Sequence, residues 1–186
     1  MMIASGRLGP HRAQRGMSLI EQIMVLAIVG VLTGIALPPL RHVLGHNRLQ
    51  VAQSDFISAL QHARSSAATS GRRTLFCPSP DGRQCSGDSR WEHGWLLGHD
   101  TDGDHQPDGG PSYTRAAYAG LRITSSAGRH DVRFKPDGSA SGSNLTLLFC
   151  EPGGRDRVLT VVVSNPGRIR GAPASAEQTT SCLGSD

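Results

Sequence analysis

The chain has 186 residues, of which 37% are hydrophobic and 4% aromatic, and this length fits one ordinary domain plus an appended segment. The formal net charge is +4, from 19 basic and 15 acidic residues, so bulk charge does not predict a nucleic-acid partner. No Gly-X-Y period, heptad run or longer repeat occurs, which excludes collagen, coiled coils and solenoids.

An apolar segment near the N-terminus follows a basic stretch. Arg7, Arg12 and Arg15 come first, and the apolar segment then occupies residues 19–37 with few polar interruptions. A helix of that length spans about 28 Å, close to the roughly 30 Å of bilayer hydrocarbon. The leading arginines place the N-terminus in the cytoplasm. We therefore expect residues 19–37 to form a single membrane-spanning helix, which disfavours a soluble cytosolic enzyme.

Glu21 decides among three interpretations of this segment. A secretory signal peptide has a basic start and an apolar middle, but residues 36–38, Ala-Leu-Pro, make a poor cleavage site. An ordinary membrane anchor has little use for Glu21, because a charged side chain in hydrocarbon costs at least about 2.5–3.5 kcal/mol. The third interpretation, a cleaved signal of another type, depends on the residues just before Glu21.

The sequence Gly16-Met17-Ser18-Leu19-Ile20-Glu21 resembles the type III signal of type IV prepilins and pseudopilins. In that family a membrane peptidase cuts after the glycine, and the new N-terminus is methylated. The resemblance implies a leader of residues 1–16, cleavage between Gly16 and Met17, and N-methylation of Met17, where the family usually has Phe. Glu21 would then neutralise the terminal ammonium of Met17, its own or a neighbour's, so that both charges become tolerable in an apolar filament core.

A second helical pattern follows over residues 40–70. Its apolar positions recur at steps of three or four, as on one face of a helix. They are Leu49, Ala52, Phe56, Leu60, Ala63 and Ala67. We expect Pro38-Pro39 to end or kink the first helix and Gly71 to end the second. Residues 17–70 are therefore predicted to form a long N-terminal helix whose amphipathic part packs on a sheet.

Residues 71–186 are typical of a globular β head with a C-terminal tail. Short apolar runs alternate with turn signals made of Gly, Pro, Asn and Asp. The predicted strands are Arg73–Cys77, Gly94–Leu97, Leu121–Thr124, Asp131–Phe134, Leu145–Cys150 and Val158–Val163. A helix followed by a strand-rich head is an α+β arrangement.

The four cysteines of the head indicate an oxidising compartment outside the cytoplasm, and they allow three pairings. We favour Cys77–Cys85, which closes a short loop, and Cys150–Cys182, which tethers the tail to a strand. Loop-closure entropy gives these two bonds about 2.6 and 3.7 kcal/mol of stabilisation. A zinc site is the alternative, but the sequence has no Cys-x-x-Cys or Cys-His spacing to support it.

The chain as a whole resembles the FimT/GspH group of minor pilins and pseudopilins. The motifs that carry the resemblance are Leu60–Ser65, Leu75–Ser79, Trp91-x-x-Gly94-Trp95, Phe134-x-Pro136-Asp137-Gly138 and Val161–Arg170. It implies a type IV pilin-like α+β fold, in which a long N-terminal helix packs on a strand-rich antiparallel β head, and a role in pilus assembly. The Gly-Arg-x-Arg element favours the FimT branch. The alternative is pseudopilin H of type II secretion, a structural component of protein export.

Arg168 and Arg170, which follow Gly167, form the candidate binding element. For the FimT branch the resemblance implies contact with extracellular double-stranded DNA during natural transformation. Arginines one residue apart on an extended chain face the same side, so both guanidinium groups can reach phosphates, and Gly167 permits the turn that presents them. Arg155 and Arg157 are candidates to join this patch. Without the resemblance, two solvent-exposed arginines on a filament surface would be the simpler interpretation.

No catalytic or metal-binding pattern is equally specific. Asp100, Asp102, Asp104 and Asp108 alternate as Ca²⁺ ligands do, but Pro111 occupies the position of the bidentate Glu of an EF-hand loop, so a polar loop is the favoured interpretation. Hydrolase, Walker and dinucleotide patterns are absent, and we expect no enzyme, cofactor or metal.

The expected partners are prepilin peptidase, other pilins or pseudopilins, the inner membrane and DNA. We expect a single-pass inner-membrane protein with a periplasmic head before assembly and an extracellular pilus subunit afterwards.

Overall fold

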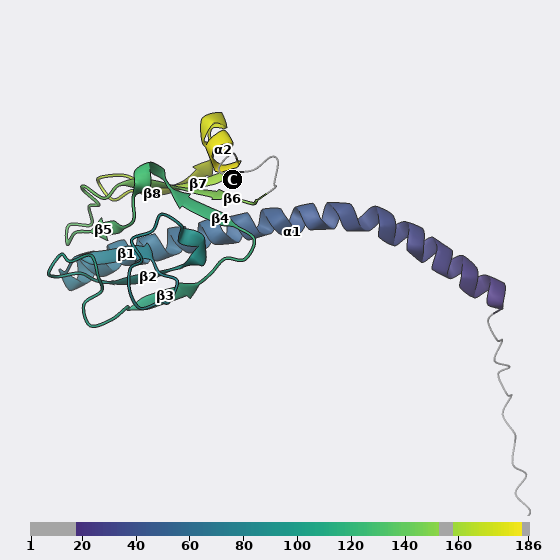
Figure 1. Cartoon of the computed structure of the whole chain (residues 1–186), viewed down its shortest axis with the longest axis horizontal. Coiled ribbons are helices and arrows are strands. Elements are labelled where there is room, and N and C mark those ends of the chain that lie inside the picture. The colour runs from purple at the N-terminus through teal and green to yellow at the C-terminus, as the bar shows by residue number, and fades with distance from the viewer. Residues whose placement is uncertain (1–17, 153–157, 184–186) are drawn as a thin grey trace, which may run out of the picture. The chain divides into compact units, whose positions relative to one another are not determined.

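The computed structural model describes residues 18–152 and 158–183, apart from the side chains of residues 34–46, 127 and 183. The chain divides into two compact units, Met1–His42 and Val43–Asp186. Helix α1 (Leu19–Ser70) contributes residues to both units, and helix α2 (Ala176–Leu183) belongs to the second (Figure 1). Of the helix predicted for residues 17–70, the described part is present from Leu19, and it ends one residue before Gly71 as expected. It does not end at Pro38-Pro39, because the helix continues through both prolines.

The first unit contains the apolar beginning of α1. Its described side chains are all exposed in the single chain, including Leu19 at 76% and Leu26 at 71%. Within the part of the chain that the structure describes, no helix combines the length and the apolar character needed to cross a membrane. The predicted span of residues 19–37 continues past Thr33 into residues whose side chains lie outside the described set.

The second unit contains two four-stranded antiparallel sheets. The first has the strand order β3-β2-β1-β5, formed by β1 (Thr74–Pro78), β2 (Gly94–His99), β3 (Tyr113–Ala116) and β5 (Val132–Phe134). The second has the order β4-β6-β7-β8, formed by β4 (Arg122–Ser125), β6 (Leu145–Cys150), β7 (Leu159–Val163) and β8 (Ile169–Pro173). Short 3₁₀ turns at Trp91–His93 and Ser126–Gly128 precede β2 and β5. The six predicted strands are present with ends shifted by at most two residues, whereas β3 and β8 were not predicted.

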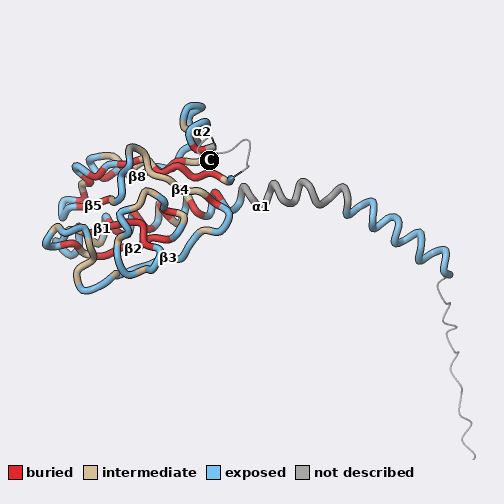
Figure 2. The backbone as a smooth tube through the Cα atoms, viewed as in Figure 1, coloured by how far each residue is buried: buried red, intermediate tan, exposed pale blue. Residues whose placement is uncertain are grey.

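The core lies where the C-terminal part of α1 packs against both sheets. All six positions of the predicted apolar stripe are buried, from Leu49 at 3% exposure to Ala67 at 0%. Figure 2 shows buried positions (red) along the strands that face this helix. Phe56 is at the centre, with ring centroids 5.8 Å from Phe76 of β1 and 5.1 Å from Phe149 of β6. One helix face thus joins the two sheets, which is the packing expected from its period.

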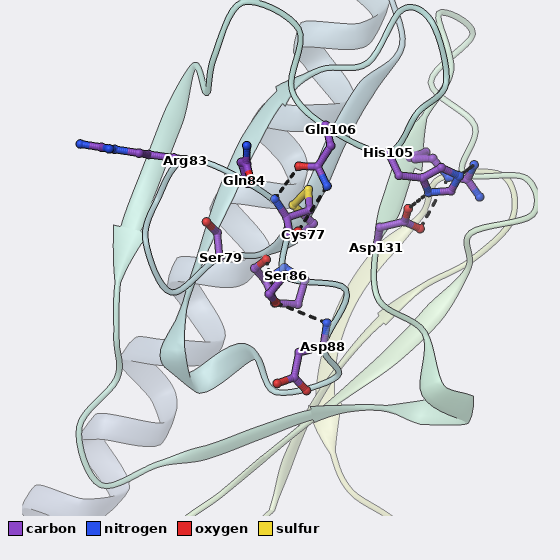
Figure 3. The surroundings of a disulfide bond; sticks show 12 residues. Cys77, Ser79, Arg83, Gln84, Ser86, Asp88, His105, Gln106 and Asp131 are labelled. Atoms are coloured by element: carbon purple, nitrogen blue, oxygen red, sulfur yellow. Dashed lines mark hydrogen bonds and ion pairs between the residues drawn. A yellow bond between two sulfur atoms is a disulfide. The ribbon is translucent and has the colours of Figure 1, made fainter.

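Two disulfides hold the periphery of the head, and they have the pairing favoured from the sequence. Cys77 and Cys85 are bonded with Cα atoms 5.6 Å apart, and they close the loop that follows β1 (Figure 3). Cys150 and Cys182 are bonded with Cα atoms 6.3 Å apart, and they attach α2 to β6. Leu148 and Val158 pack with the second pair in a small apolar cluster. Helix α2 is therefore fixed on the outer face of the second sheet.

Candidate functional site

Glu21 lies in the first turn of α1, three residues after Ser18. The Glu21 amide donates a hydrogen bond to Ser18 Oγ at 3.3 Å and another to the Ser18 carbonyl at 3.0 Å. Ser18 is thus the N-terminal cap, and a carboxylate in the first turn interacts favourably with the positive end of the helix dipole. Gly16 and Met17, the predicted cleavage and methylation residues, lie outside the described residues.

The candidate binding element is exposed at an edge strand. Ile169 and Arg170 begin β8, where they pair with Val163 and Val162 of β7. Arg168 and Arg170 are exposed, while Ile169 between them packs against the core. Because side chains alternate along a strand, Arg170 faces the outer side of β8, opposite Ile169. Arg168 precedes the strand and lies at the edge of a groove beside α1. Both arginines are therefore exposed to solvent, one on each side of Ile169 in the sequence.

Gly167 fixes this element to the rest of the head. Its φ is +78°, and a Cβ built there would lie 2.0 Å from the Gly138 carbonyl oxygen, so only glycine fits. Arg64 of α1 donates from Nε to the same carbonyl oxygen at 3.0 Å. The Ala140 amide donates to the Asn165 carbonyl at 2.9 Å. The turn before β8 is thus held against the turn after β5, and the helix holds both.

A groove of about 510 Å³ runs between α1 and these two turns. It is lined by Gln61, Arg64, Ser65, Ala68, Asp137, Gly138, Arg168 and Ile169. The pKa of Asp137 is held below its usual value, chiefly by hydrogen bonds from the Ser139 hydroxyl and amide. The positive charge of Lys135 makes a smaller contribution. Asp137 therefore stays anionic at neutral pH and offsets part of the positive charge of the two arginines in the groove. The outer side of β8, where Arg170 lies, is the more favourable place for an anion.

A further arginine borders the outer face of the second sheet. Val162 of β7 pairs with Arg170 of β8 on one side and with Thr146 of β6 on the other. The three residues therefore share one face of the sheet. Arg129 lines a groove of about 460 Å³ together with Thr146 and Val162, and its Nη1 donates to the Gly142 carbonyl at 3.1 Å. Sequence reasoning missed Arg129, because only the strand pairing brings it to this face. Arg155 and Arg157 were the expected additions to the patch, and they lie outside the described residues.

Comparison with known families identifies the chain. The model of the family "Type II transport protein GspH" matches residues 52–167, well over half of the sequence. The chain belongs to the GspH family. The prokaryotic N-terminal methylation motif matches residues 11–37, which is the mark of a processed, membrane-anchored pilin-type subunit and implies a prepilin peptidase. The match to the GspH family model ends at Gly167, so Arg168 and Arg170 lie beyond it.

Individual relatives of this GspH family member are pilin-like proteins. The pilin-like protein PilA1 of Thermus thermophilus is 30% identical over 165 residues, which cover 84% of this chain and 97% of that protein. A fimbrial protein of Pseudomonas aeruginosa is 34% identical over 73 residues, which cover 39% of this chain and 47% of that protein.

Solved structures show the same fold. The type IV minor pilin FimU of Pseudomonas aeruginosa superposes with a TM-score of 0.57 at 22% identity, over 69% of this chain and 90% of FimU. The minor pseudopilin EpsH of the Vibrio cholerae type 2 secretion system superposes with a TM-score of 0.50 at 14% identity, over 68% of this chain and 97% of EpsH. The GspH family chain thus has the expected type IV pilin-like α+β fold.

Proposed function

We propose that the protein is a minor type IV pilin of the FimT branch, which acts in pilus assembly and binds extracellular double-stranded DNA during natural transformation. The observation that carries the DNA proposal is the exposure of Arg168 and Arg170 at the start of edge strand β8, with Ile169 between them packed inward. Before assembly the protein is a single-pass inner-membrane subunit with a periplasmic head, and afterwards it is part of the extracellular pilus.

The chemistry of these arginines suits phosphate. A guanidinium group is always charged and donates two parallel hydrogen bonds to phosphate oxygens. Arg168, Arg170 and Arg129 offer three such contacts around the outer edge of the second sheet, which predicts a log–log salt slope of about −2 to −3. Such binding is weak and independent of sequence, and several subunits in one filament would strengthen it by avidity.

Replacing both edge arginines tests this proposal. We expect Arg168→Ala/Arg170→Ala, made in the full chain in detergent, to weaken duplex DNA binding about tenfold or more in a gel-shift assay. The log–log salt slope should fall in magnitude by about 2, because two phosphate contacts are lost.

The matched control removes the same charge elsewhere. Arg83→Ala/Arg90→Ala changes two exposed arginines in the loop between β1 and β2, and Figure 3 shows Arg83 directed away from the disulfide. This variant should bind DNA like the wild type. If both double variants bind equally well, or if both weaken equally, the DNA assignment to β8 is wrong.

Glu21 has a separate role in the proposal, the pairing with the Met17 amine during assembly. Glu21→Gln separates this role from helix capping, because Gln serves equally well at the third helical position of a capping box. We expect the variant to be cleaved and folded normally but to assemble poorly into pili, as counted by electron microscopy or shearing. Glu177→Gln, an exposed change in α2, is the control and should assemble normally. Normal assembly of Glu21→Gln would refute the pairing.

A second candidate function is that of a type II secretion pseudopilin. It is favoured by the family to which the chain belongs, that of the type II transport protein GspH, and by the fold shared with EpsH. Deletion of the gene discriminates the two functions. Loss of transformation or piliation with normal protein export supports the minor pilin, and loss of protein export supports the pseudopilin.

A further inference from the structure

The connection between β2 and β3 brings three carboxylates together. Asp100 directly follows β2, and Asp102 and Asp104 come next in the same loop. Each offers one carboxylate oxygen, and these three oxygens all lie within 4.8 Å of one another. Ca²⁺ binds oxygen ligands at about 2.3–2.6 Å, so two ligands of one ion lie at most about 5 Å apart. The spacing therefore fits a single ion.

The burial of Asp100 is a second and independent observation. Asp100 has no exposed surface, and Asp102 and Asp104 beside it are exposed. Asp100 Oδ1 accepts a hydrogen bond from the Gly103 amide at 2.7 Å, but Oδ2 is buried and has no hydrogen-bond partner among the described residues. A buried carboxylate oxygen without a partner is costly, and the cost of an ionised one is larger still. A solvated polar loop would not bury it, whereas a bound cation would satisfy it.

We propose that Asp100, Asp102 and Asp104 bind one Ca²⁺ ion, with the remaining coordination supplied by backbone carbonyls and water. Hard carboxylate oxygens without nitrogen or sulfur ligands suit Ca²⁺, and the smaller Mg²⁺ requires near-ideal octahedral geometry and keeps most of its water. The two disulfides place the head in an oxidising compartment, where extracellular calcium modules have Kd values of about 0.1–1 mM.

Two neighbouring cations lower the affinity of this site for Ca²⁺. Arg72 Nη2 donates to Thr101 Oγ1 at 3.0 Å, and Arg73 Nη1 lies 3.0 Å from the position of a Cβ on Gly103. Asp108 has another partner: its Oδ2 accepts from the Thr101 amide at 2.6 Å, and this hydrogen bond is the largest cause of its lowered pKa. Asp108 therefore shapes the loop rather than serving as a fourth carboxylate ligand.

Contacts outside the cluster hold the loop in place before an ion binds. Gln106 accepts from the Cys85 amide at 2.8 Å and donates to the Cys85 carbonyl at 3.3 Å. His105 Nδ1 lies 2.5 Å from Asp131 Oδ2. Figure 3 shows Gln106 reaching the disulfide loop and His105 reaching Asp131. The ordering cost of binding is thereby reduced, and a bound ion would stabilise the loop together with the disulfide loop and β5.

This site can be tested by calorimetry and by thermal unfolding. Both use the full chain in a non-ionic detergent, after removal of divalent ions by EGTA. We expect one Ca²⁺ per chain with a Kd of about 0.1–1 mM. Ca²⁺ at about ten times that Kd should raise Tm by about 5 °C, and Mg²⁺ should have a much smaller effect. Asp102→Asn/Asp104→Asn should weaken Ca²⁺ binding at least about tenfold.

The variant is chosen so that folding is not at issue. Asp102 and Asp104 are exposed, so the double variant should keep the wild-type Tm in EGTA. Asp137→Asn, which neutralises an exposed carboxylate in another turn, is the matched control and should retain full Ca²⁺ binding. The proposal is overturned if the wild type shows neither heat nor a Tm shift with Ca²⁺, if Mg²⁺ acts equally, or if the double variant binds like the wild type.

Discussion

Phe56→Ala should lower the free energy of unfolding by about 3–5 kcal/mol, the usual cost of removing a large aromatic ring from a packed core. The Phe56 side chain is fully buried. Its ring centroid lies 5.1–6.1 Å from the rings of Phe76, Trp91, Trp95, Tyr118 and Phe149. The truncation therefore leaves a cavity where α1 joins both sheets, and the edge-to-face ring contacts are lost as well. The change in the free energy of unfolding is measured by urea unfolding of the full chain in detergent, with tryptophan fluorescence as the signal.

Two further variants make this result specific. Ser54→Ala lies on the same helix at an exposed position and should change stability by less than about 0.5 kcal/mol. Phe56→Leu keeps most of the buried volume and should cost clearly less than Phe56→Ala. If Phe56→Ala costs no more than Ser54→Ala, the aromatic cluster does not hold the helix to the sheets.

The amphipathic half of α1 could be predicted because a single period determines it. Leu49, Phe56 and Leu60 recur at helical spacing, and burial of that face needs no knowledge of what covers it. The alternating or continuous apolar runs of β6 and β7 are predictable for the same reason. In each case the signal comes from residues close together in the sequence.

The edge strands lack that local signal. All four residues of β3 are exposed, so no burial pattern marks it, and its pairing with β2 alone defines it. In β8, Gly171 looks like a break in the sequence, but a Cβ there would lie 2.9 Å from Gln53 Nε2 of α1. The glycine permits close approach of strand and helix, which only the tertiary structure shows.

The candidate site was predictable in part. The exposure of Arg168 and Arg170 could be expected from their charge and from the alternation around Ile169, and the structure has both exposed. The support beneath them was not predictable. Arg64 and Gly138 are 74 positions apart in the sequence, and their hydrogen bond depends on the packing of α1 against both turns. The buried, unpartnered oxygen of Asp100 is likewise a property of the folded chain.

Gly167→Ala should lower the free energy of unfolding by about 2–4 kcal/mol and weaken DNA binding together with it. Part of the cost is the left-handed backbone conformation, about 1–2 kcal/mol for a residue with a Cβ. The rest is steric, because the Cβ would lie 2.0 Å from the Gly138 oxygen and the turn before β8 must move away. Urea unfolding and the DNA gel shift measure the two effects.

Gly87→Ala is the matched control, since Gly87 has φ +67° and no atom lies within 4 Å of its Cβ position. This variant should show the backbone cost alone and leave DNA binding unchanged. Equal destabilisation by the two variants would mean that the contact between the turns does not position the arginines.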